Sequence, residues 1–274
     1  MRFLNKLLAH KTNNFIIVKI QKKIMKIFNI YYVPTNIQKL PENKYTTNSH
    51  FNITKQRFGY QSEIVKKFNK TNNLVSFNTC PRIAQILKML FLDENSKFNF
   101  LDFGGEDIDF YLYLKKKFRN INYFVYNKKE INQDFVKLKE KYKLENITVL
   151  ENISDISNNK YDFICFGSVI QYVENYEQIL SIAIKVSKKY IFFSATHFFS
   201  KIINKKKGII VRQVNFLPSE IYCYFFNFND FLEIFTKNKF YIVSKEKNIV
   251  GNINYNNFGS SLGNISYTDL LLSL

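Results

Sequence analysis

Hydrophobic and polar positions follow a regular strand–helix rhythm from residue 98 onward. Short apolar runs, typical of buried strands, alternate with longer segments whose apolar positions recur at helical spacing. The predicted strands are KFNFLDFGG, INYFVYN, ITVLEN, the first half of YDFICFGSVIQYV, and KYIFFSAT, and the predicted helices between them are IDFYLYLKKKF, KEINQDFVKLKEKY and YEQILSIAIKVS. Such alternation predicts a mostly parallel sheet with helices on both faces, which is a Rossmann-like α/β fold.

The C-terminal part departs from this rhythm. GIIVRQVNFL is predicted to be a strand or an extended insert, and NFNDFLEIFTKN is predicted to be a helix that Asn229 could cap. FYIVSKEKNI and ISYTDLLLSL are predicted to be two further strands.

The N-terminal part contains a basic amphipathic segment. Residues 15–30, FIIVKIQKKIMKIFNI, predict a helix with Ile20, Ile24, Ile27 and Phe28 at helical spacing and lysines towards the other side. Two interpretations are open: a helix packed on the main domain with its lysines in solvent, or a helix that lies on a membrane surface.

The next segment separates this helix from the regular domain. Residues 33–60 are polar and contain two prolines, which predicts an irregular connector, and helices are predicted at residues 61–69 and 81–94. We therefore expect a helical and irregular N-terminal extension over residues 1–60 and one large domain over residues 61–274.

The composition limits the possible partners. The formal net charge is +18, but only five of the 40 basic residues are arginine, so nearly all of the positive charge is lysine. Nucleic-acid readers usually rely on the bidentate geometry of arginine, and a general excess of Asn, Ile, Phe, Tyr and Lys is what a genome rich in A and T produces. The composition therefore argues against nucleic acid as the partner.

The cysteines and the apolar runs indicate a location. Cys80, Cys165 and Cys223 are far apart and have no CxxC or Cys/His spacing, so neither a disulfide framework nor a metal site is expected. No run is long and apolar enough to span a bilayer, and the first residues lack the apolar core and cleavage site of a signal peptide. We expect a cytoplasmic protein, peripheral to the inner membrane if residues 15–30 bind it.

The first predicted strand of the large domain ends in a glycine loop, FLDFGGEDIDF. Gly104 and Gly105 let the backbone approach a ligand closely, and the following helix start presents unpaired N–H groups. A pyrophosphate site requires a third glycine and an uncrowded helix start, whereas Glu106 and Asp107 stand there. A ligand with a cationic centre and no phosphate fits better, and S-adenosyl-L-methionine is one. The alternative is a plain turn followed by acids that cap a helix.

Several motifs occur together with this loop. They are Phe58-Gly59-Tyr60, LDFGG, FVYN at the end of the second strand, SVxQY (Ser168, Val169, Gln171, Tyr172), VxQV (Val211, Gln213, Val214) and the aromatic pair Phe225-Phe226. As a set, they resemble the class I SAM-dependent methyltransferases, and more narrowly a methyltransferase family encoded among bacterial surface-polysaccharide (O-antigen/LPS) genes. The resemblance covers roughly residues 55–274.

The resemblance implies a fold and part of a cofactor site. The fold would be a seven-stranded, mostly parallel sheet with an antiparallel last strand. Asp102, Gly104 and Gly105 would line the methionine end of S-adenosyl-L-methionine, and Phe103 and Ser168 would also belong to the cofactor site.

Two further cofactor positions follow from the resemblance. Asn127 stands where such enzymes carry an acid that accepts both ribose hydroxyls, and an amide lacks the charge-assisted strength of that contact. Asn152, beside Glu151, stands where the adenine amino group is usually bound. The cradle thus departs from the family pattern at Asn127 and at the missing third glycine.

The candidates for chemistry follow the fourth and fifth strands. His197 lies just past the fifth strand and has an ordinary pKa that suits proton transfer at neutral pH, so it is the candidate base. Tyr172, together with Gln171, could orient a hydroxyl of the methyl acceptor.

Three functions remain open from the sequence. The first is a SAM-dependent methyltransferase, O-directed, that acts on a small-molecule or glycan substrate such as a precursor of cell-surface polysaccharide. The second is a methyltransferase-like domain that has lost catalysis and serves as a binding or scaffold protein, as Asn127 and Glu106 suggest. The third is a basic peripheral protein that docks on nucleic acid or anionic lipid.

Overall fold

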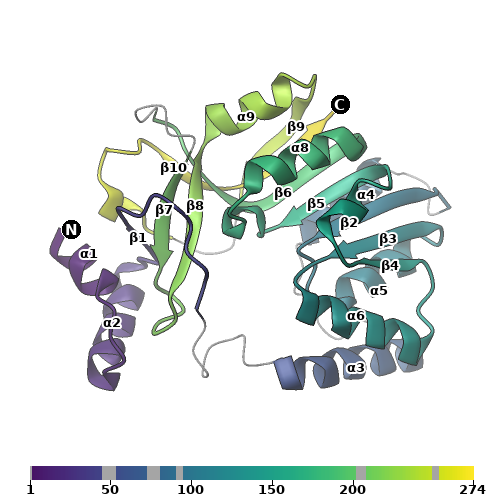
Figure 1. Cartoon of the computed structure of the whole chain (residues 1–274), viewed down its shortest axis with the longest axis horizontal. Coiled ribbons are helices and arrows are strands. Elements are labelled where there is room, and N and C mark those ends of the chain that lie inside the picture. Colours follow the sequence, from purple (N-terminus) through teal and green to yellow (C-terminus); the bar gives the residue numbers. More distant parts are fainter. Residues whose placement is uncertain (1, 45–53, 73–80, 91–94, 202–207, 249–252) are drawn as a thin grey trace.

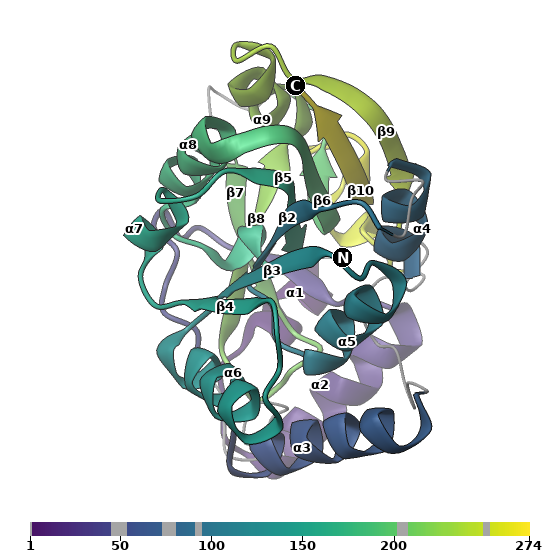
Figure 2. The ribbon, with the colours of Figure 1, turned by 90° about the vertical axis from the view of Figure 1, so that its right-hand side faces the viewer.

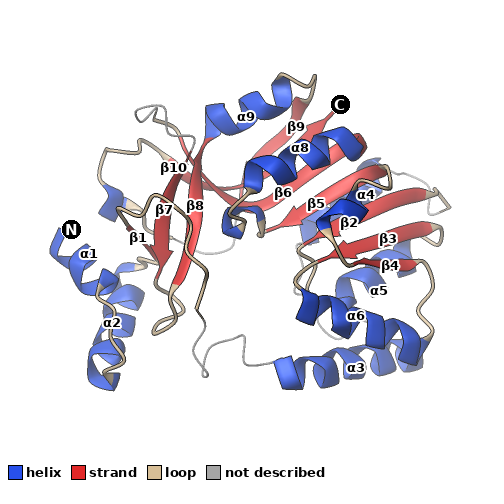
Figure 3. Ribbon diagram, viewed as in Figure 1, coloured by secondary structure: helices blue, strands red, loops and turns tan. Residues whose placement is uncertain are grey.

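The computed structural model of the chain describes residues 2–44, 54–72, 81–90, 95–201, 208–248 and 253–274. One continuous, strongly curved sheet runs through the molecule, with helices on both of its faces (Figures 1 and 3). Part of the predicted helix at 81–94 and the cysteine at position 80 lie outside the described residues.

Seven strands form the central sheet, in the order β4-β3-β2-β5-β6-β10-β9. They are β2 (Phe98–Phe103), β3 (Ile121–Tyr126), β4 (Ile147–Leu150), β5 (Tyr161–Gly167), β6 (Ser187–Phe199), β9 (Tyr241–Lys247) and β10 (Ile265–Ser273). The first five in spatial order run parallel, and β10 is antiparallel to both of its neighbours. The predicted mostly parallel sheet with an antiparallel last strand is confirmed.

Helices cover both faces of this sheet because alternate strand residues point to opposite sides. On β5, for example, Phe163 and Cys165 belong to one buried cluster and Ile164 and Phe166 to the other. The first face is covered by α3 (Thr54–Thr71), α4 (Pro81–Leu90), α5 (Ile108–Lys117) and α6 (Lys129–Tyr142), and the second by α7 (Ile153–Ile156), α8 (Tyr176–Val186) and α9 (Phe228–Thr236). Figure 2 shows α3, α5 and α6 together beside β3 and β4.

Among the described residues, three more strands extend the sheet to ten, which is more than the predicted seven. They are β1 (Tyr32–Pro34), β7 (Gly208–Gln213) and β8 (Ile221–Asn227). β8 pairs in parallel with the last two residues of β6, β7 pairs antiparallel with β8, and β1 pairs antiparallel with β7. The GIIVRQVNFL segment is therefore a strand.

β6 can join both parts of the sheet because it bends in its middle. Ala195 has a left-handed backbone with φ of 52°, and the register of β10 against β6 shifts between Thr268 and Leu270. The carboxyl group of Asp269, only 3% exposed, fills this irregularity. It accepts hydrogen bonds from the Ala195 N–H at 2.8 Å and from the Ser194 hydroxyl at 3.1 Å. A third bond to Asp269 comes from the Asn248 side-chain amide at 2.8 Å.

The N-terminal helices pack on this extension. They are α1 (Arg2–Ala9), which the sequence did not predict, and α2 (Phe15–Phe28), which it did. Leu8, Val18 and Met25 form a buried cluster with Val214 and Leu217, which follow β7. Residues 2–34 are thus built into the sheet through β1 and pack against it through α1 and α2.

Two local predictions need correction. Residues 54–60 were predicted to belong to an irregular connector but form the first two turns of α3, so the expected boundary at residue 60 falls inside a helix. The cap of α9 is Asn227, whose side-chain oxygen accepts from the N–H groups of Asn229 and Asp230, whereas Asn229 was expected to be the cap. Within the described ranges, no helix has the length and hydropathy needed to cross a membrane.

Candidate functional site

The central sheet has a topological switch point between β2 and β5. From β2, the chain order proceeds outward to β3 and β4 on one side and to β5 and β6 on the other. In open α/β sheets, ligands bind in the crevice beyond the carboxyl ends of the strands at such a point. The loops that meet there follow β2, β3, β4 and β5, and they hold most of the residues predicted from the sequence.

The glycine loop after β2 is packed tightly against its surroundings. Gly104 has φ of +82°, and its N–H donates to the Tyr126 carbonyl at 2.7 Å. A Cβ on Gly104 would lie 2.5 Å from a methyl group of Val169, and a Cβ on Gly105 would lie 2.6 Å from the Cγ atom of Asp102. Both glycines are therefore required by the packing of the loop itself.

Asp102 lies beneath this loop and faces the protein interior. Its carboxyl group is 5% exposed and accepts a hydrogen bond from the Tyr123 hydroxyl. Burial raises the pKa of Asp102 to about 7; the bond from Tyr123 opposes this rise, and the charges of Asp107 and Glu106 add to it. Asp102 thus supports the loop from below. Phe103 is also buried, with its ring 5.0 Å from that of Phe166, so only its backbone can face the crevice.

Asn127 ties the end of β3 to the glycine loop. Its side-chain amide donates to the Gly105 carbonyl at 2.8 Å, and its side-chain oxygen accepts from the Lys128 N–H at 2.7 Å. Asn132 then bonds the Asn127 N–H at 2.9 Å and the Leu150 carbonyl at 2.8 Å. A chain of amides therefore links the ends of β2, β3 and β4, a role for Asn127 that the sequence did not reveal.

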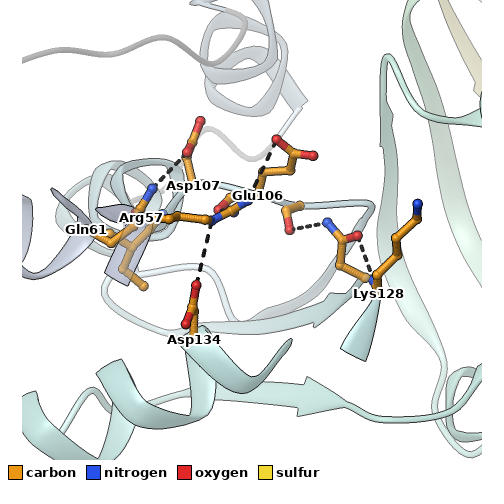
Figure 4. Close-up of polar contacts among 9 residues, drawn as sticks. Arg57, Gln61, Glu106, Asp107, Lys128 and Asp134 are labelled. Atoms are coloured by element: carbon orange, nitrogen blue, oxygen red, sulfur yellow. Dashed lines mark hydrogen bonds and ion pairs between the residues drawn. The ribbon is translucent and has the colours of Figure 1, made fainter. Parts of the chain in front are cut away.

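Helix α3 supplies two residues that sequence reasoning missed (Figure 4). Gln61 donates to Asp107 at 2.8 Å and accepts from the Ile108 N–H at 2.8 Å, so it caps α5 from outside. Asp107 holds the N-cap position but makes no side-chain cap bond, so the alternative in which the acids cap the helix is not what the structure shows.

The second α3 residue, Arg57, lies beside the same loop. Its guanidinium group donates to the Glu106 carbonyl and lies 4.0 Å from the carboxylates of Glu106 and Asp134. No local sequence signal marks Arg57 or Gln61, because their partners are more than 40 residues away along the chain.

The loop after β5 lies on the other side of the switch point. Ser168 has φ of 56°, and its hydroxyl accepts from the Gln171 side chain at 3.2 Å. Gln171 is 1% exposed and also donates to the Ala195 carbonyl at the bend of β6. The Tyr172 hydroxyl donates to Gln213 of β7 at 2.7 Å. These contacts bring the SVxQY and VxQV motifs together.

Asn152 lies at the end of β4, at the outer side of the crevice. Asn152 and Glu151 are both exposed, and the Asn152 N–H donates to Asp155 at 2.8 Å. Their side chains are therefore accessible to a ligand.

His197 lies in a closed aromatic cluster. It is 1% exposed, its ring stacks on Phe225 at 4.4 Å, and the rings of Tyr32 and Tyr267 lie at 4.5 and 4.4 Å. Among the described residues, neither ring nitrogen has a hydrogen-bond partner. Burial lowers the pKa of His197 to about 3. A histidine in this environment stays neutral and is a weak base at pH 7, which argues against its predicted role as the catalytic base.

A cavity of about 280 Å³ lies on the far side of these aromatics, at the carboxyl end of β9. Its lining residues are Asn29, Lys247, Asn248, Ile253, Asn254, Tyr255, Ile265 and Tyr267. The Tyr255 hydroxyl is buried and has no partner among the described residues. The sequence did not indicate this cavity, because its lining comes from segments that are distant in the chain.

Comparison with known proteins gives distant structural similarities. No family model matches the sequence, and no curated protein matches it. The N-terminal domain of EvdMO1, in the presence of S-adenosylhomocysteine and D-fucose, shares 11% identity over 73% of this chain and 84% of its own, with a TM-score of 0.49.

Two other solved structures show similarity at the same level. The 1,6-didemethyltoxoflavin-N1-methyltransferase of Burkholderia thailandensis shares 11% identity over 88% of this chain and 94% of its own, with a TM-score of 0.48. The magnesium protoporphyrin IX methyltransferase of Synechocystis PCC 6803 shares 13% identity over 83% and 92%, with a TM-score of 0.45. TM-scores below 0.5 are too low to assign an activity, so the assignment depends on the residues and topology of this chain.

The packing of the loop predicts opposite effects for two glycine substitutions. Gly105→Ala is expected to lower the free energy of unfolding by about 1–3 kcal/mol because the new methyl group meets the Asp102 carboxyl. Gly59→Ala, inside α3 with nothing within 4 Å, is expected to raise it by about 0.5–1 kcal/mol. Urea unfolding of both variants would check this. A neutral Gly105→Ala substitution would contradict the packing described.

The raised pKa of Asp102 predicts a pH dependence of stability. The folded protein holds a proton that the unfolded chain releases near pH 3.8, so this group stabilises the fold at low pH. Its contribution is lost as the pH rises towards about 7, with a slope of at most about 1.4 kcal/mol per pH unit.

Asp102→Asn keeps an acceptor for the Tyr123 hydroxyl but cannot titrate. We expect the variant to gain stability over the parent protein between pH 4 and 7, measured by urea unfolding at a series of pH values. Parallel curves for the two proteins would show that Asp102 is ionised throughout.

Proposed function

We propose that this chain is a SAM-dependent methyltransferase that acts on a hydroxyl of a sugar or glycan precursor of cell-surface polysaccharide. The observation that supports this most directly is the glycine loop at the switch point between β2 and β5. The sheet around it is mostly parallel with an antiparallel last strand, β10, as the resemblance of the sequence implies.

The negative charges around the glycine loop fit a cofactor with a cationic centre. The start of α5 carries Glu106 and Asp107, and the exposed Glu151 lies at the end of β4. Carboxylates repel a phosphate and favour a cationic sulfonium. Gln61 already occupies the Ile108 N–H at the helix start, which further disfavours a phosphate there.

Polar side chains around the crevice are also accessible to the cofactor, although Asp102 and Phe103 have a different role from the one expected. Asn127 and Ser168 are half-buried, and Asn152 is exposed, so polar groups from three loops can contact a ligand in the crevice. In the proposal, these three residues contact the cofactor, and Gly104 and Gly105 supply backbone. Asp102 and Phe103 support the loop from beneath. When bound, S-adenosyl-L-methionine would supply a methyl group on its sulfonium.

We propose that the cavity at the carboxyl end of β9 holds a distal sugar unit of the acceptor, while the reacting hydroxyl lies at the switch point. The lining of this cavity combines tyrosine rings and isoleucines with asparagine side chains and Lys247. A sugar has apolar C–H faces that pack on such rings and hydroxyls that bond to amides. Tyr172 and His197 lie in the aromatic region between the switch point and this cavity, where they shape the acceptor side of the site.

A catalytically inactive scaffold is the second candidate, and one observation favours it. The Asn127 amide is already bonded to the Gly105 carbonyl and the Lys128 N–H, so the ribose position is partly closed.

Calorimetric titration with S-adenosylmethionine and S-adenosylhomocysteine tests the proposal and separates these candidates. We expect binding in the micromolar range. Asn127→Asp should strengthen it about fivefold or more, because a carboxylate cannot donate to the Gly105 carbonyl and instead accepts ribose hydroxyls in charge-assisted bonds. Asn122→Asp, at the opposite end of β3, makes the same change of charge away from the crevice and should leave the affinity unchanged.

Two results of the titration would contradict parts of this proposal. Absence of binding at millimolar cofactor would overturn the enzyme proposal and leave the scaffold. Equal affinities of the Asn127→Asp and Asn122→Asp variants would remove Asn127 from the cofactor site without removing the cofactor.

The acceptor proposal is tested at Tyr255. Its hydroxyl has no partner among the described residues, so Tyr255→Phe should leave the melting temperature unchanged. We expect a roughly tenfold higher KM in a transfer assay with radiolabelled methyl cofactor against sugars, sugar nucleotides and lipid-linked glycans. Tyr241→Phe, on the exposed face of β9, is the matched control. Unchanged kinetics in both variants would place the distal sugar unit elsewhere.

A further inference from the structure

The α1–α2 hairpin carries a concentration of exposed apolar side chains. Twelve large hydrophobic residues are strongly exposed in the described part of the chain, and six of them lie on these two short helices: Phe3, Phe15, Ile16, Ile20, Ile27 and Phe28. Phe3, Phe15, Ile16 and Ile27 are each more than 60% exposed. The hairpin lies at the end of the molecule opposite α6 (Figure 1). Exposed apolar groups gathered in this way mark an interaction surface.

The geometry of α2 divides its surface into three sectors. At 100° per residue, the buried Val18, Gln21 and Met25 point towards the protein. Ile16, Ile20 and Ile27 fall within about 40° of one another on the solvent side. We call these three residues the isoleucine stripe. The lysines of the helix, Lys19, Lys22, Lys23 and Lys26, occupy the adjoining sector of about 100°.

The charged side chains of the N-terminal region are all positive. Residues 1–41 contain eight lysines and arginines and no aspartate or glutamate. Lys11 and Lys39 form ion pairs with Glu220 and Glu174, but no carboxylate of a described residue lies within 4.0 Å of a lysine of α2. These four lysines are thus available to an external anionic surface.

The helix is fixed before any partner arrives. Asn14 caps its start with hydrogen bonds to the N–H groups of Ile16 and Ile17. The buried Gln21 side chain donates to the carbonyls of Leu7 and His10 at 2.7 and 2.8 Å, which holds α1 and α2 together. Docking therefore requires no folding step, and the loss of conformational entropy on binding is small.

We propose that α1 and α2 dock on a bilayer of anionic phospholipid, with the isoleucine stripe in the acyl–headgroup boundary and the α2 lysines among the phosphates. A helix of this length lies about 21 Å along the surface. Nucleic acid would neutralise the lysines but leave the isoleucines in water, and a second copy of the hairpin would bring lysines against lysines. The proposal does not depend on the cofactor.

Vesicle flotation with the whole chain tests this docking. The probes are vesicles of phosphatidylglycerol mixed with phosphatidylcholine, and vesicles of phosphatidylcholine alone. We expect binding to the first and at least tenfold weaker binding to the second. Replacing the four α2 lysines by glutamine should weaken binding at least tenfold, and replacing the isoleucine stripe by serine should do so as well.

Matched controls separate specific docking from general adsorption. Lys129 and Lys139 on α6, and Lys143 and Lys239 in the loops after α6 and α9, are all exposed and are replaced by glutamine to give the same change of net charge. Met89→Ser removes an apolar side chain that is 75% exposed on α4. Both controls should float like the parent protein, and the melting temperatures of all variants should agree. Point substitutions are preferable to truncation because Leu8, Val18 and Met25 belong to a buried cluster.

Three outcomes would overturn the proposal. One is equal weakening by the α2 and the control lysine replacements, which indicates adsorption by net charge. Another is unchanged flotation of the isoleucine-stripe variant, which indicates no insertion. The third is a dimer in sedimentation velocity, without vesicles, that the serine replacements dissociate, because the stripe would then bind a second copy.

Discussion

The fold depends on one buried carboxyl group, that of Asp269. Three hydrogen bonds to it hold the left-handed backbone at Ala195, and that conformation bends β6 between two sets of strands. Without the bend, β6 would pair with β5 and β10 only, and β8, β7 and β1 would have no edge on which to form. Because this second set of strands lies beyond the carboxyl ends of the first, the bend also determines where the candidate site is enclosed.

The parallel core could be predicted from the sequence because its signals are local. Each apolar run is bounded by polar or glycine residues, and α6 begins and ends at the predicted residues, Lys129 and Tyr142. The extension could not be predicted in the same way. β1 is three residues long, and its position depends on pairing with β7, almost two hundred residues later in the chain. Alternation of apolar residues indicates that a strand exists but not which distant strand it pairs with.

The sequence likewise predicted where the residues of the candidate site lie, but not which groups each of them contacts. The glycine loop, Asn127, Asn152 and the loop after β5 all lie at the switch point, because the carboxyl ends of parallel strands share one edge of the sheet. The sequence could not show that Asn127 bonds the glycine loop, or that Arg57 and Gln61 hold it from α3. Nor could it show that aromatic rings enclose His197, since those rings come from three strands and one loop that are distant in the chain.

Because β10 lies between β6 and β9, the sheet cannot be completed until this last strand is inserted. Ser194 and Asp269 are 75 residues apart in sequence, so β6 and β9 each present an open edge until β10 is inserted. Contacts that close such long loops form slowly, and unpaired strand edges are sites of aggregation in the meantime. The exposed face of β9 carries lysines and a glutamate among its apolar residues. Charges on an edge strand oppose pairing with another chain, so they protect β9 from aggregation before β10 is in place.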